Sequence, residues 1–263
     1  MATTLKAHQT IPPAGVALPV KVAPPGIRVD NLTLRFDAHT IFEDLSFEIR
    51  GGEFVALLGS SGVGKSSLLK IIGGLAKATS GSVIGSDGLP VENRIAYMGQ
   101  QDLLLPWLNV FENVTLGARL RREKVDKAWA EHLLERVGLP TRHKTLPAAL
   151  SGGMRQRAAI ARTLYERRPI VLMDEPFSAL DAITRSMVQD LAAELLEGRT
   201  VLLITHDPME ACRLGHHLMV LSGHPAKLGT PITVAGKPPR SPDDPDLQKS
   251  QGELLRLFVE NAR

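Results

Sequence analysis

The sequence predicts an α/β fold built on a mostly parallel central sheet, with a helical block inserted into it. Two short runs, 170–173 and 201–204, are apolar throughout, as strands buried on both faces of a parallel sheet are. A helical segment lies between them, and strands that alternate with helices form parallel sheets. A glycine-rich stretch, 59–66, joins a further apolar run, 54–58, to another helix.

The predicted elements follow in order along the chain. Hydrophobic residues alternate over 27–36, which predicts a strand, and 41–49 continues in that style before a glycine pair at 51–52. The remaining expectations are strands at 54–58, 82–84, 94–98, 170–173 and 201–204, and helices over 65–72, within 110–139, and over 153–165, 180–196 and 253–259. Residues 241–245, Ser-Pro-Asp-Asp-Pro, are expected to form a linker.

Composition limits the classes of protein to consider. A chain of 263 residues suggests about one or two domains. No stretch approaches the ~18 consecutive apolar residues of a membrane-spanning helix. The segment 1–26 lacks the apolar centre of a signal peptide, and its prolines predict a flexible tail. A net charge of +3 is too modest to indicate a nucleic-acid partner.

The single cysteine, Cys212, excludes an internal disulfide and suits a reducing cytoplasm. Its surroundings predict a short helix, and a buried structural thiol is the favoured interpretation.

The glycine-rich stretch carries the strongest chemical signal. It fits a phosphate-binding loop with two glycines four residues apart followed by Lys and Ser, and its residues are Gly59, Ser60, Ser61, Gly62, Val63, Gly64, Lys65 and Ser66. Glycines let backbone N–H groups turn toward an anion, and the dipole of the following helix favours negative charge there. Lys65 is expected to reach the β- and γ-phosphates, and the Ser66 hydroxyl to ligate Mg²⁺. The alternative is a glycine-rich turn without a ligand, which the strand–loop–helix context disfavours.

Asp174 and Glu175 end an apolar strand, at the sheet edge where α/β proteins bind ligands. Asp174 is expected to hold Mg²⁺ through water, and Glu175 to orient or deprotonate an attacking water. The alternative is that the pair caps the following helix, and only the phosphate loop upstream favours the catalytic interpretation.

Ser151, Gly152 and Gly153 open a helix and offer a second anion site through their amides and the Ser hydroxyl. These three residues taken alone are equally consistent with an ordinary helix cap.

The phosphate loop, the Ser151–Arg157 segment, the Asp174–Glu175 strand end and Thr205-His206-Asp207 occur in an order that resembles the ATP-binding-cassette (ABC) ATPase family. The resemblance covers about 27–230. It implies a mostly parallel core, an antiparallel β subdomain and an inserted helical subdomain. It implies a flexible tail at 1–25, an ATPase domain at 26–232 with its helical part at about 100–166, and an extension at 233–263.

The resemblance also assigns roles. Leu150 to Gln156 matches the signature motif, which closes on the γ-phosphate of ATP held by another subunit. Gln100 matches the Q-loop glutamine that contacts Mg²⁺ and water. It is chosen over the adjacent Gln101 because family members place four residues between this glutamine and the Leu that precedes Pro106. The other implied site residues are Ser67 beside the phosphate loop, Asp181 in a D-loop at 178–181, the switch histidine His206 and the adenine-stacking Phe36, which would equally serve as core.

Within the family, 104–107 (Leu-Leu-Pro-Trp), 154–157 and 238–240 resemble ATPases of nitrate, sulfonate, taurine and thiamine-pyrimidine importers, and 98–107 is most similar to the pyrimidine branch. This implies ATP and Mg²⁺ as cofactors, a homodimer of ATPase subunits, membrane permease subunits and a substrate-binding protein as partners, and a place at the cytoplasmic face of the membrane.

Two other functions stay open on the sequence. One is a soluble ABC ATPase acting in DNA repair or translation, which would carry a long coiled-coil insertion or two cassettes. The other is a regulatory module without turnover, which the carboxylate of Glu175 disfavours.

The apolar segment 103–107 beside Gln100 is expected to be a loop. It is interpreted as the surface that receives the permease, because exposed apolar patches with an aromatic anchor commonly mark interfaces. The alternative is burial in the core of the helical block.

Overall fold

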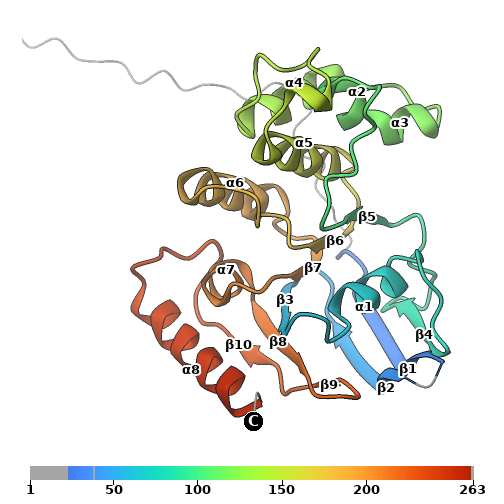
Figure 1. Cartoon of the computed structure of the whole chain (residues 1–263), viewed down its shortest axis with the longest axis vertical. Helices are drawn as coiled ribbons and strands as arrows, with labels where there is room; N and C mark the ends of the chain where they lie inside the picture. Colours follow the sequence, from blue (N-terminus) through green and yellow to red (C-terminus); the bar gives the residue numbers. More distant parts are fainter. Residues whose placement is uncertain (1–22, 38, 262–263) are drawn as a thin grey trace, which may run out of the picture.

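The structure, a computed structural model, describes residues 23–37 and 39–261, with side chains as far as residue 256. Its central sheet has the strand order β10-β8-β3-β7-β6-β5, and β9 pairs with β8 (Figure 1). Five strands run parallel to one another: β3 (Phe54–Gly59), β5 (Ile95–Met98), β6 (Ile170–Asp174), β7 (Thr200–Ile204) and β8 (His217–Ser222). The short strands β9 (Lys227–Leu228) and β10 (Ile232–Thr233) are antiparallel to β8. The mostly parallel α/β sheet is thus confirmed, and β8, β9 and β10 are strands that the sequence pattern does not predict.

A second, antiparallel sheet has the order β2-β1-β4. It consists of β1 (Ile27–Phe36), β2 (His39–Ile49) and β4 (Ser80–Gly85). The helix α1 (Lys65–Ile72) buries its apolar side chains between this sheet and one face of the central sheet, in a shared hydrophobic core. The phosphate loop therefore leads into a helix that is held from both sides.

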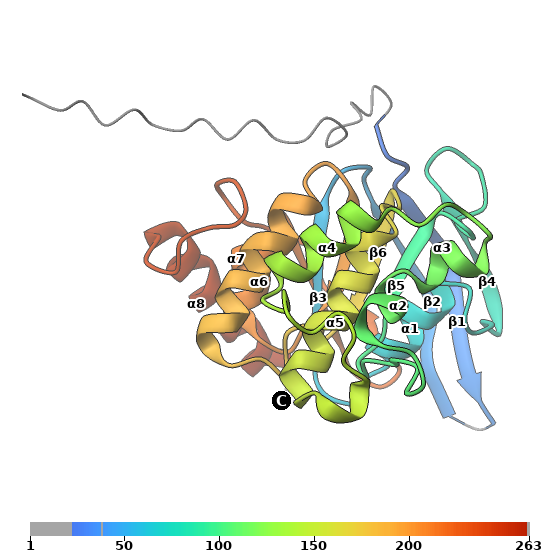
Figure 2. The same ribbon diagram turned by 90° about the horizontal axis from the view of Figure 1, so that it is seen from above.

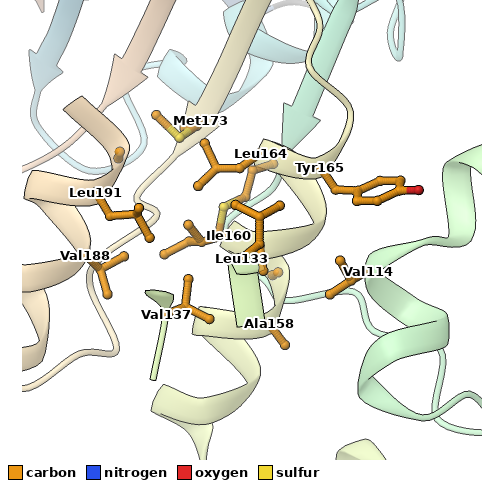
Figure 3. Close-up of a cluster of buried hydrophobic side chains, with 14 of the residues drawn as sticks. Val114, Leu133, Val137, Ala158, Ile160, Leu164, Tyr165, Met173, Val188 and Leu191 are labelled. Carbon is orange, nitrogen blue, oxygen red and sulfur yellow. The ribbon is translucent and has the colours of Figure 1, made fainter. Parts of the chain in front are cut away.

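The helices between β5 and β6 lie together at one end of the molecule (Figure 1). They are α2 (Val110–Val114), α3 (Leu116–Leu120), α4 (Lys127–Arg136), the 3₁₀ turn Pro147–Ala149 and α5 (Gly152–Tyr165). Their apolar faces meet α6 (Ala182–Leu195) and the second face of the central sheet in another core, part of which Figure 3 shows. Seen from above in Figure 2, α5 and α6 lie over the strands of this sheet.

The C-terminal part differs from the expectation. Residues 241–244 form the predicted linker, and the helix predicted at 253–259 is the second half of a longer helix, α8 (Pro245–Asn261). Leu247 and Leu254, seven residues apart, are fully buried beside α7 (Pro208–Leu214), so the apolar stripe begins earlier than the sequence analysis assumed. Pro245 is tolerated because it occupies the first helical turn.

Two further expectations concern the membrane and the N-terminus. Among the described residues, the structure contains no helix with both the length and the apolarity needed to cross a bilayer. The predicted flexible tail, 1–25, lies almost wholly outside the described residues.

Candidate functional site

The predicted site residues follow the carboxyl ends of three neighbouring parallel strands, β3, β7 and β6. β7 pairs with β3 on one side and with β6 on the other. The phosphate loop follows β3, Glu175 follows β6 and His206 lies two residues beyond β7. The backbone continues the pairing, since Glu175 N donates to Ile204 O at 2.9 Å and Thr205 N donates to Leu57 O at 3.2 Å. Residues far apart in sequence thereby meet at the carboxyl ends of adjacent strands.

The shape of the phosphate loop depends on glycine at two positions. Gly59 has φ 156°, and a Cβ there would come within 2.3 Å of the Leu221 carbonyl oxygen. Gly64 has φ 108°, and a Cβ there would lie 2.6 Å from Ile41 Cγ2. Gly64 is also the N-cap of α1, so the loop leads directly into a helix N-terminus. These glycines allow a tight loop whose amides are available to an anion.

Lys65 is buried within the loop that precedes it. Its Nζ donates to Gly59 O at 2.8 Å and to Ser60 O at 2.9 Å. Burial lowers the pKa of the Lys65 ammonium, and the negative charges of Glu175 and Asp174 oppose that shift. A cation is thus fixed between the loop and the carboxylates, where phosphate oxygens would be attracted.

Asp174 is almost fully buried beside the first turn of α1. Burial raises the pKa of the Asp174 carboxyl, whereas a hydrogen bond from Ser66 lowers it and the nearby Glu175 raises it further. A buried carboxylate next to a hydroxyl supplies the hard oxygen ligands that Mg²⁺ prefers, together with phosphate oxygens and water. Ser66 and Asp174 therefore fit the magnesium ion that the sequence predicts.

Glu175 contacts two other predicted site residues. Its Oε2 lies 3.3 Å from His206 Nδ1 and accepts a 3.5 Å hydrogen bond from Gln100 Nε2. Its backbone has φ 48°, a left-handed conformation uncommon for a non-glycine residue and often found at functional sites. Of the two adjacent glutamines, Gln100 is the one that reaches Glu175, which favours the register chosen from the sequence.

The alternative role of Asp174 and Glu175 as helix caps is not what the structure has. The following helix, α6, begins at Ala182 and is capped by Asp181, whose side chain accepts from Thr184 N at 3.0 Å. The carboxylates of the strand end are thus left for the site itself.

Ser151, Gly152 and Gly153 lie apart from the phosphate loop, at the N-terminus of α5 (Figure 1). Ser151 is exposed and caps the helix, accepting from Met154 N at 3.3 Å. Gly153 approaches the Ala179 carbonyl oxygen beside Asp181, so the predicted signature and D-loop are neighbours. The structure brings Lys65, Asp174, Glu175, His206 and Gln100 together in one group, and leaves the Ser151 segment facing outward from the same chain.

Phe36 is 58% exposed at the end of β1, so the core role considered for it is wrong. Ser67 lies half-buried in α1, directly after Ser66.

The apolar loop 103–107 matches neither interpretation completely. Leu104 is buried in the core of the helical layer, whereas Leu103 is 59% and Trp107 71% exposed. The segment is a loop, as predicted, and it presents its aromatic residue to the outside.

Sequence reasoning missed two charged residues beside the site. Glu210 and Arg185 line a small hollow together with Glu175 and His206, with Ser178, Thr205 and Asp207 completing the wall. For Glu210, the signal in the sequence was a charged residue next to the apolar Ala211 on a short helix whose residues are mostly buried.

Comparisons with known proteins agree with one another. The family model described as ABC transporter matches residues 42–178. A protein of Haemophilus influenzae, named as an uncharacterized ABC transporter ATP-binding protein, is 43% identical over 235 residues, which span 88% of this chain and 97% of that protein. The aliphatic sulfonates import ATP-binding protein SsuB 2 of Pseudomonas syringae pv. tomato is 41% identical over 231 residues, covering 87% of this chain and 95% of its own.

Solved structures show the same architecture. A dimeric ATP-binding cassette in a post-hydrolysis state, bound to ADP and Pi, matches with a TM-score of 0.71 at 31% identity, over 80% of this chain and 99% of that one. An ATP-binding subunit of an ABC transporter matches with a TM-score of 0.74 at 26% identity, over 90% and 99% of the two chains.

Proposed function

Because this chain belongs to the ABC transporter family of ATP-binding proteins, we propose that it is the ATP hydrolase that energises import of a small solute through a membrane complex. One observation carries the proposal. The cation of Lys65, the buried Asp174 and the paired Glu175 and His206 converge at one sheet edge, beside a glycine-rich loop that leads into a helix N-terminus. This set of groups is the one that phosphoryl transfer to water requires.

Each residue has a definite task in that reaction. The loop amides and Lys65 would hold the phosphates, and Ser66 and Asp174 would hold Mg²⁺, which would supply positive charge to the phosphates. Glu175 orients the attacking water and accepts its proton at a carboxylate oxygen. Gln100 and His206 keep that carboxylate in place, since both contact the same Oε2 atom.

The second anion site acts in trans. Ser151 and Gly152 are exposed at a helix N-terminus, where partial positive charge attracts phosphate. We assign them to the γ-phosphate of ATP held by a second copy of this chain, with Asp181 beside the contact. Two copies then enclose two ATP molecules, as expected for a cassette that resembles a dimeric one.

The exposed Leu103 and Trp107 are assigned to contact with membrane permease subunits at the cytoplasmic face, in a complex that includes a substrate-binding protein. Several relatives are named for the import of aliphatic sulfonates, so a small sulfonate is the first solute to test.

Two measurements test the function. Turnover of MgATP by the purified chain excludes a regulatory module without hydrolysis. Copurification with an integral membrane protein separates an importer subunit from a soluble ATPase of DNA repair or translation. A chain that hydrolyses ATP but is recovered with DNA or ribosomes instead of membranes would overturn the importer assignment.

A further inference from the structure

Two arginines of α5 hold the start of the apolar loop. Arg155 donates from Nε to Asp102 Oδ2 at 3.1 Å. Arg162, two helical turns further along α5, donates from Nη2 to Asp102 O at 2.6 Å and from Nη1 to Leu103 O at 2.8 Å. All three hydrogen bonds have a charged donor, and such bonds are stronger than those between neutral groups. They connect residues about fifty to sixty positions apart in the sequence.

These bonds hold a backbone shape that non-glycine residues rarely adopt. Leu103 has φ 48°, in the left-handed region. Asp102 also accepts from Leu104 N at 3.0 Å through Oδ1. Burial lowers the pKa of the Arg162 guanidinium, and the charges of Asp102 and Glu166 oppose that shift. Because a half-buried guanidinium left without acceptors is costly, Arg162 favours this arrangement of the loop.

The far end of the loop is attached to the same helical layer. Asn113 of α2 is fully buried, and its Oδ1 accepts from Leu105 N at 2.8 Å. Its Nδ2 donates to Leu105 O at 3.2 Å and to Leu108 O at 2.9 Å. The exposed side chains of Leu103 and Trp107 are therefore carried on a loop that is fixed at both ends to α5 and α2.

The same helix also contacts the catalytic turn. Gln156, which follows Arg155, donates from Nε2 to Pro176 O at 2.8 Å, and Pro176 follows Glu175. The first turns of α5 thus contact the exposed loop through Arg155 and the catalytic turn through Gln156.

From these contacts we infer that Arg155 and Arg162 are positioning residues that make loop 102–107 move as one body with the helix that carries Ser151. The inference rests on the proposed function, in which Ser151 meets ATP held by a second copy. A displacement of α5 on closure then reaches Leu103 and Trp107 directly, because the loop between them and the helix is held by charge-assisted bonds.

Hydrogen exchange of the full chain in the Glu175→Gln background, with and without MgATP, tests this link. Arg155→Ala removes the bond to Asp102 and a second bond, from Nη1 to Leu150 O at 2.8 Å, whereas Asp102→Asn removes only the charge of the carboxylate that Arg155 contacts. Neither residue lies in the phosphate loop. Arg119→Ala is the matched control, since it breaks an exposed ion pair with Glu112 in the same helical layer. Arg155→Lys keeps the charge and should restore part of the effect.

In the parent and in the control, MgATP should change exchange at both 151–158 and 102–108. In Arg155→Ala and Asp102→Asn, the amides of 103–105 should exchange about ten-fold faster, and their response to MgATP should disappear. In Asp102→Asn, ATP affinity and the response at 151–158 should stay near those of the parent, which a general loss of structure would not allow. If Arg155→Ala unfolds, Asp102→Asn decides, because it keeps the size and shape of the side chain.

Two results would overturn the inference alone: a loop response in Asp102→Asn equal to that of the parent, or a parent that responds at 151–158 but not at 102–108. A parent that binds ATP without any response at 151–158 would overturn the trans site of the proposed function, and the inference with it.

Discussion

His206 Nδ1 lies 3.3 Å from Oε2 of Glu175, so the residue after β6 and a histidine two residues beyond β7 share one polar contact. Glu175 is mostly buried, whereas His206 is largely exposed. A carboxylate positioned in this way is suited to hold a water molecule in line with a phosphate that enters from the exposed side.

Glu175→Gln keeps the shape of the side chain and can still contact Gln100 and His206, but it cannot accept a proton. ATP hydrolysis should fall by about 10²–10⁴-fold, the usual effect of losing a general base. ATP binding should persist, and the variant should accumulate as a closed dimer, measured by size-exclusion chromatography with MgATP. Glu197→Gln, in an exposed ion pair with Lys237, is the control and should hydrolyse ATP normally. Normal turnover by the Glu175 variant would assign the base to another residue.

Lys65→Ala removes the cation that the loop carbonyls hold. Charge-assisted hydrogen bonds contribute about 1.5–3 kcal/mol, so ATP should bind roughly ten- to a hundred-fold more weakly, and hydrolysis should be lost. Equilibrium binding of a fluorescent ATP analogue measures the first effect and phosphate release the second. Lys70→Ala alters an exposed lysine of the same helix and should leave both unchanged. An unchanged hydrolysis rate in Lys65→Ala would show that the glycine-rich loop is not part of the active site.

Local sequence patterns were sufficient for the parts of this site whose chemistry depends on spacing within one segment. The positions of Lys65, Glu175 and Ser151 follow from loops that must join a strand to a turn or a helix. Pairing between distant side chains could not be read in this way. The bond between Arg155 and Asp102 joins residues 53 apart, and neither residue type indicates its partner.

The same limit applies to Gln100 and α8. Residue type does not distinguish two adjacent glutamines, and only the family's spacing favours Gln100 in the sequence; the path of the loop then places Gln100 at Glu175. The early start of α8 depends on Leu247 packing beside α7, a tertiary contact that the polar residues 248–251 conceal.

Ser151→Arg should leave ATP binding by a monomer nearly unchanged, because Ser151 does not contact its own phosphate loop. Hydrolysis should be lost, since the larger side chain blocks the place where the γ-phosphate of a second copy arrives. Mixing this variant with Lys65→Ala gives a sharper test. Each variant alone is inactive, but their heterodimer has one intact site, built from Lys65 of one chain and Ser151 of the other. Partial recovery of phosphate release supports the trans arrangement, and a mixture as inactive as its components contradicts it.

Trp107→Ala should lower transport and copurification of the permease more than ATP binding by the isolated chain, because the indole is 71% exposed. Its melting temperature should hardly change. Leu104→Ala, at a buried position of the same loop, is the contrast and should lose about 2–5 kcal/mol of stability. Trp107→Ala protein that unfolds would show a core role for the indole, and normal transport would place the permease contact elsewhere.

Glu210 carries a buried carboxyl group beside Thr205 and Asp207. Its Oε2 accepts from Gln189 Nε2 at 3.2 Å, and within the described residues Oε1 has no hydrogen-bond partner. Burial raises the pKa of Glu210 to about 7, a hydrogen bond from Thr205 and the charge of Arg185 oppose this, and the charge of Asp207 adds to it. The folded chain therefore keeps a proton on this group at pH values where the unfolded chain has lost it.

The sign of the pH dependence follows from that difference. Stability from protonated Glu210 is complete below pH 4.5 and is lost as the pH rises to about 7, at about 1.4 kcal/mol per unit and on the order of 3 kcal/mol in all. Glu210→Gln cannot ionise, so its stability lacks this pH dependence. The unfolding free energy of the variant minus that of the parent should therefore increase from pH 5 to 7 and stay constant above pH 7. Urea unfolding at several pH values measures the difference, with the exposed Glu197→Gln as a control that should show no such trend. A difference between Glu210→Gln and parent that is constant across this range would mean that Glu210 is already ionised in the folded chain.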